Sequence, residues 1–127
     1  MVMLIPDDFK HIEIVAAAAH DNALQHGFYD DIEDTLQFLN AQDKAKEAAD
    51  SKRNFILAQL SKVGCEVGEA VEAIQKHEDY SGVGEELADI MIRTMDLARY
   101  MGLHIGDEIF RKMKKNITRP YKHGKIC

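Results

Sequence analysis

Proline is almost absent from the interior of this chain. The two prolines, Pro6 and Pro120, lie near the two ends of the 127 residues. Proline breaks helices because it lacks a backbone N–H and its ring clashes with the preceding turn, so the chain between these residues is free to be helical. That interior is rich in Ala, Leu, Glu, Lys, Gln and Met, which favour helices, and it shows no sustained period-two alternation typical of strands. These features predict an all-α fold.

Apolar residues recur at spacings of three and four along four segments, as they do on one face of a helix. The first predicted helix begins after Pro6, with Asp7 or Asp8 as its cap, and ends near Gly27. Three further helices are predicted over residues 51–76, 83–100 and 105–117.

Residues 30–52 carry a weaker apolar pattern than the rest of the chain. Ile32, Leu36 and Leu39 form a short stripe, and the polar sequence DKAKEAADSKR follows. We expect a short helix here, followed by a mobile, solvated connection.

The overall composition bounds the class of protein. A length of 127 residues fits one domain. No apolar run approaches the roughly 20 residues that span a bilayer, and the first residues lack the pattern of a signal peptide. The two cysteines, Cys65 and Cys127, form no CxxC motif and are expected to be reduced thiols. We therefore expect a cytoplasmic protein that does not bind membranes.

Charge is distributed unevenly along the chain. Residues 111–127 carry seven Lys or Arg and no acid, whereas the other 110 residues carry 9 basic and 22 acidic groups. Nucleic acids are bound by basic faces, so an acidic body argues against a nucleic-acid partner. A basic end beside an acidic body suits a small polyphosphate that is bridged by a metal ion.

Two pairs of acids stand out on the predicted helices. Glu66 and Glu69 are three residues apart on one helix, and Glu86 and Asp89 are three apart on the next, so each pair projects from one helical face. Mg²⁺ is commonly held by a few carboxylates together with waters and substrate phosphates. Carboxylates beside a packing stripe repel each other and lose hydration, a cost that a bound cation would remove.

The stretch from Glu66 to Asp89, EVGEAVEAIQKHEDYSGVGEELAD, resembles the MazG-like nucleoside triphosphate pyrophosphatases, whose pattern is ExxE, a spacer and ExxD. Sixteen residues separate Glu69 from Glu86. The segments AAAHDNALQHGFYD and KKNITRPYKHGK also resemble parts of such proteins. The resemblance implies a single MazG-like domain over residues 1–127, a bundle of four to five helices completed by oligomerisation. Residues 32–52 would be an atypical insertion.

The resemblance also implies an activity. The protein would hydrolyse (deoxy)nucleoside triphosphates to the monophosphate and pyrophosphate, with Mg²⁺ as cofactor and Mn²⁺ able to replace it. The metal ligands and catalytic residues would be Glu66, Glu69, Glu86 and Asp89. Relatives form dimers or tetramers, so a homodimer or homotetramer is expected.

Further residues are candidates for substrate contacts. Basic side chains donate charge-assisted hydrogen bonds to phosphate oxygens, and the polar C-terminal candidates are Lys112, Lys115, Asn116, Arg119, Tyr121, His123 and Lys125. A basic last turn that complements the helix dipole is the structural alternative. Phe28, Tyr29 and Tyr80 are candidates for stacking on a base, although aromatic residues beside glycine turns more often serve packing.

Three alternative interpretations of the sequence exist. A di-iron bundle needs Glu-x-x-His pairs, and this chain has none. His20 and Asp21 mimic the dyad of HD-type phosphohydrolases, but without further histidines in register they are expected on the helix surface. A non-catalytic helical module that binds a nucleotide or a protein stays open as the alternative function.

Overall fold

The computed structural model describes residues 3–77 and 79–120 of the chain, and this part is helical without strands. A 3₁₀ helix, η1, is followed by five α-helices, which confirms the predicted all-α class. Their bounds are η1 Pro6–Phe9, α1 Lys10–Gln25, α2 Asp30–Ala41, α3 Ala45–Lys76, α4 Val83–Tyr100 and α5 Ile105–Ile117.

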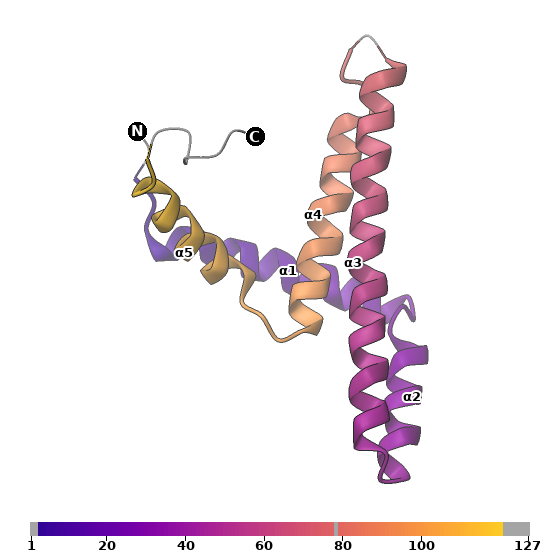
Figure 1. Cartoon of the computed structure of the whole chain (residues 1–127). Helices are drawn as coiled ribbons and strands as arrows, with labels where there is room; N and C mark the ends of the chain where they lie inside the picture. The colour runs from indigo at the N-terminus through magenta and orange to yellow at the C-terminus, as the bar shows by residue number, and fades with distance from the viewer. Residues whose placement is uncertain (1–2, 78, 121–127) are drawn as a thin grey trace.

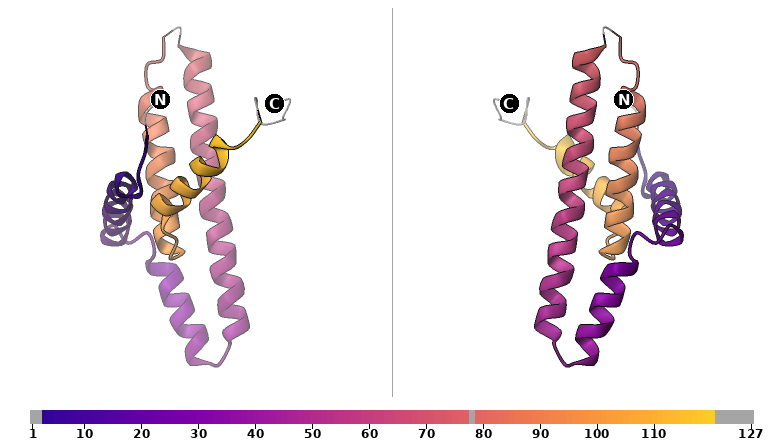
Figure 2. Two further views of the ribbon diagram at one scale, coloured as in Figure 1. Left: turned by 90° about the vertical axis from the view of Figure 1, so that its left-hand side faces the viewer. Right: turned by 90° about the vertical axis from the view of Figure 1, so that its right-hand side faces the viewer.

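The long helix α3 is the central element. Figure 2 shows α2 and α4 packed along successive halves of α3, each antiparallel to it. Helix α1 crosses α4, and α5 packs on α1 and η1 at the end of the molecule away from α3 (Figure 1). Short turns between the antiparallel helices make this arrangement possible.

The first helix begins differently from the prediction. Neither Asp7 nor Asp8 caps α1, because Pro6 opens the separate 3₁₀ turn and α1 follows it from Lys10. The Asp8 carboxylate instead accepts a hydrogen bond of 2.8 Å from the backbone N–H of Ile5. At the other end, Gly27 has a φ of +75°, a conformation that suits glycine and stops the helix as predicted.

The prediction of a solvated connection before residue 51 was wrong. The chain turns within three residues after Ala41, and α3 already begins at Ala45. The segment Ala45–Ala49 is alanine-rich and favours helix, and Ala48 is buried. Residues 30–52 therefore form α2 and the first turns of α3, which pack together as a helical hairpin.

Aromatic rings join the α1–α2 turn to the two central helices. Tyr29 stacks on Tyr100 of α4 with ring centroids 4.7 Å apart, and Phe55 of α3 lies 5.5 Å from Tyr29. Ala23 and Ile32 complete this buried cluster. Because Tyr29 is only 3% exposed, its ring serves packing.

Much apolar surface stays open in the single chain. Large side chains such as Val15, Phe38, Leu60 and Met91 are about half exposed or more. Exposed apolar area of this size commonly marks an interaction surface where it is contiguous. Among the described residues, no helix contains an apolar stretch long enough to span a membrane.

Candidate metal centre

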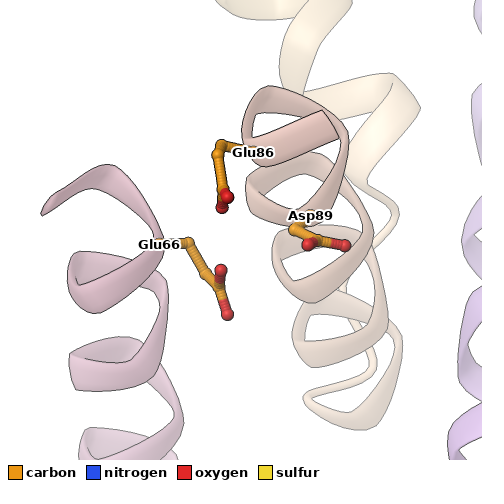
Figure 3. Close-up of side chains that lie close together, drawn as sticks. All are labelled: Glu66, Glu86 and Asp89. Atoms are coloured by element: carbon orange, nitrogen blue, oxygen red, sulfur yellow. The ribbon is translucent and has the colours of Figure 1, made fainter. Parts of the chain in front are cut away.

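The antiparallel packing of α3 on α4 brings acids from both helices together. Figure 3 shows the carboxyl groups of Glu66 and Glu86 facing each other between the two helices, with Asp89 nearby on α4. One oxygen from each residue lies within 4.8 Å of the others. Ligands of one Mg²⁺ sit about 2.1 Å from it and hence at most about 4.2 Å apart, so only a small closure would be needed.

Glu69 lies at the edge of this acid cluster, by which we mean Glu66, Glu86 and Asp89. Its side chain is exposed and is not among the three that converge. It still interacts with Glu86, because its charge and a hydrogen bond both help to raise the pKa of that residue. The fourth predicted acid is thus beside the cluster.

Glu86 is the acid of the cluster whose pKa responds most clearly to burial and to the neighbouring negative charges. Burial, and then the negative charges of Glu69, Glu66 and Asp89, raise the pKa of its carboxyl above the usual 4.5. Its Oε2 atom is buried without a hydrogen-bond partner in the described chain. An orphaned buried carboxylate oxygen is costly, and a cation would satisfy it. The donor set, all oxygen and anionic, fits a hard divalent cation.

Arg93 supplies the positive charge that balances Glu66. Glu66 is only 7% exposed, and its Oε1 lies 2.5 Å from Nε of Arg93. Sequence reasoning missed this residue. A signal existed, because Arg93 follows Asp89 by four positions and Glu86 by seven, which puts all three on one face of α4.

A cavity of about 420 Å³ adjoins the acid cluster between α1, α3 and α4. Asp89 and Arg93 line it on the cluster side, and Asn22 and Phe28 line it on the α1 side. Its volume falls in the range of small-molecule sites. Phe28 is 68% exposed and available to a ligand, whereas Tyr80 does not line this cavity.

The prediction that His20 lies on the helix surface was wrong. His20 is mostly buried, and its Nδ1 is 2.8 Å from Oδ1 of Asp96 on α4. Its ring also packs edge-on against Tyr29. Asp21 is exposed, and no metal-binding group of the described residues includes His20, so the pair is no HD-type site. His20 instead fixes α1 to α4.

The basic C-terminal candidates lie elsewhere in the single chain. Lys112, Lys115 and Asn116 are on α5 and Arg119 follows it, while Figure 1 shows α5 separated from α3 by α1 and α4. No residue of α5 lines the cavity beside Asp89. The remaining candidates, Tyr121, His123 and Lys125, lie outside the described residues. Their contact with phosphate stays a prediction.

Comparison with known proteins assigns the chain to a family. The family model described as MazG nucleotide pyrophosphohydrolase domain matches residues 57–123, more than half of the chain. The match contains both acid-bearing segments and α5, and it leaves out α1 and α2. No curated protein and no solved structure matches the chain significantly. On the strength of this match, the chain belongs to the MazG nucleotide pyrophosphohydrolase family.

Proposed function

We propose that this protein hydrolyses nucleoside triphosphates, ribose or deoxyribose, to the monophosphate and pyrophosphate with Mg²⁺, which Mn²⁺ can replace. The acid cluster carries the proposal, because it pairs an unsatisfied buried carboxylate oxygen of Glu86 with a cavity of nucleotide-compatible volume. Membership of the family supports the reaction class.

In this proposal Glu66, Glu86 and Asp89 hold the cation. Bound there, it would neutralise phosphate charge and polarise the α-phosphoryl group. Water attacks the α-phosphorus, a new P–O bond forms, and the bond from that phosphorus to the bridging oxygen of pyrophosphate breaks. We assign the water's proton to Glu69, a further carboxyl group that is exposed beside the cluster.

A panel of common and damaged triphosphates, with product identification, tests the activity. Formation of monophosphate and pyrophosphate that stops when the metal is chelated is the expected result. The alternative is a non-catalytic helical module that binds a nucleotide or a protein. Nucleotide binding without pyrophosphate release from any substrate would favour that alternative.

We also propose that the functional unit is a homodimer or a homotetramer. An almost entirely apolar groove of about 430 Å³ runs between α1, α4 and α5, lined by Val15, Met91 and Met95 among others. Val15 is 49% and Met91 61% exposed in the single chain. A second copy of the chain would cover this face and remove apolar area from water.

A further inference from the structure

We propose that Lys62 and Arg93 bind phosphate groups of the nucleotide in the cavity beside the acid cluster. This inference rests on the proposed function and identifies phosphate-binding side chains within the same chain as the acids. The sequence predicts phosphate contacts in the basic C-terminal segment, whose α5 lies away from the acids in the single chain.

The positions of the two residues favour this role. Lys62 precedes Glu66 by one helical turn on α3, and Arg93 follows Asp89 by one turn on α4. Both line the cavity, where they are the only Lys or Arg among the described residues. A phosphate held between them would lie next to the carboxylates that hold the cation.

The two cations retain hydrogen-bonding capacity for a ligand. A guanidinium has five N–H donors, and the single carboxylate of Glu66 can accept about two of them in a bidentate pair. Within residues 3–77 and 79–120, Arg93 has no second ion-pair partner and Lys62 has none. Arg93 keeps 46% of its side chain exposed despite the ion pair.

Charge balance leads to the same assignment. Glu66, Glu86, Asp89 and Glu69, if all ionised, would keep a net charge of about −2 around one divalent cation. That charge would repel a triphosphate. Lys62 and Arg93 bring the total close to zero, so the polyphosphate can approach the cation.

Binding of inorganic pyrophosphate to the Mn²⁺-loaded protein tests the inference. Lys62→Gln, Arg93→Lys and Arg93→Gln are compared by calorimetry with two controls, Lys46→Gln on α3 and Arg99→Gln on α4, neither of which lines the cavity. Affinity for Mn²⁺ alone is measured first on each protein. Arg93→Lys guards against misfolding, because it keeps a charge beside buried Glu66.

We expect Lys62→Gln and Arg93→Gln each to weaken pyrophosphate binding about tenfold, with a smaller loss in Arg93→Lys and none in the controls. Lys62→Gln should bind Mn²⁺ at least as tightly as the wild type does, because a positive charge beside the site is removed. Unchanged pyrophosphate affinity in Lys62→Gln and both Arg93 variants, or an equal loss in the controls, overturns the inference. Turnover of nucleoside triphosphates by the wild type is measured separately. If the wild type shows no turnover, the proposed function fails, even where the variants still weaken pyrophosphate binding.

Discussion

The acids of the cluster differ in how their charges are compensated. Glu66 is paired with Arg93, whereas Glu86 is surrounded by other carboxylates and has a buried oxygen without a donor among the described residues. The same feature that suits Glu86 to a cation makes it unfavourable when no cation is bound. The charge state of Glu86 should therefore affect the free energy of unfolding of the metal-free protein.

The stability of the metal-free protein should depend on pH through Glu86. Because its pKa is raised in the folded chain, the native state holds the proton more tightly than the unfolded state does. Proton binding by Glu86 therefore stabilises the fold at pH values below about 4.5. This stabilisation is lost as pH rises from there through the raised pKa. Metal-free Glu86→Gln should melt at a higher temperature than the wild type at pH 7, and the gap should close towards pH 4. A gap that does not change with pH would contradict this prediction.

Removing one negative charge within the acid cluster or beside it should act on turnover. Glu69→Gln and Asp89→Asn keep side-chain size but remove one negative charge, so each should lower pyrophosphate release by at least about a hundredfold. Metal-free stability should be unchanged or slightly higher, because repulsion is relieved. The matched control is Glu72→Gln, an exposed α3 residue that pairs with Lys76. Near wild-type turnover in both acid variants would sink the proposed mechanism.

Among the elements, α5 is fixed to η1 by a close backbone approach and to α1 by a hydrogen bond. Gly106 donates a hydrogen bond of 2.6 Å to Oε1 of Glu13, and a Cβ there would lie 2.5 Å from the carbonyl oxygen of Phe9. Gly106→Ala should therefore lower the free energy of unfolding by about 1–3 kcal/mol. Gly64→Ala, in the middle of α3 with open space around its Cβ position, should instead stabilise by about 0.5–1 kcal/mol. Denaturant unfolding of both variants measures this contrast, and equal effects would refute it.

Helix boundaries were predictable where the chain carries explicit stop signals. Gly27 ends the first helix as predicted, and both Gly27 and Gly102, just after α1 and α4, adopt left-handed φ angles that suit glycine. The start of α3 was missed because no glycine or proline marks it. The polar sequence after Ala41 was interpreted as solvated, although burial of Ala48 holds it in the helix. That burial depends on tertiary packing, which local patterns do not encode.

At the candidate site, too, local patterns predicted what lies on one helix, and tertiary packing decided the rest. Spacing along each helix predicted the two acid pairs, and the rotation of α3 against α4 then decided that Glu66, rather than Glu69, joins Glu86 and Asp89. The cavity draws on α1, α3 and α4, three elements whose mutual orientation no single-helix pattern contains. Arg93 was overlooked for this reason, since its role depends on a partner on another helix.

At the scale of the whole molecule, a single chain does not explain two features. Apolar side chains stay exposed along the groove between α1, α4 and α5, and the basic residues of α5 lie away from the acids. In the proposed dimer, a symmetric partner would cover the groove, and its α5 would lie near the acids of the first chain. Val15→Glu, which puts a charge into the groove, should lower the mass measured by light scattering towards that of a monomer. Gln42→Glu, at the exposed α2–α3 turn, should not.

Mixing two variants with complementary defects tests whether a partner's α5 serves the acids. Asp89→Asn removes an acid, and Lys115→Gln combined with Arg119→Gln removes two basic residues of the α5 end. If each site takes its acids from one chain and its basic residues from the other, a mixed dimer contains one intact site and one doubly defective site. Random exchange at equal amounts makes half of the dimers mixed, so turnover should recover to about a quarter of the wild-type value. Recovery should appear only after unfolding and refolding the two variants together, or after slow exchange. If both substitutions act within one chain, no mixture contains an intact site and turnover stays at the level of the parents.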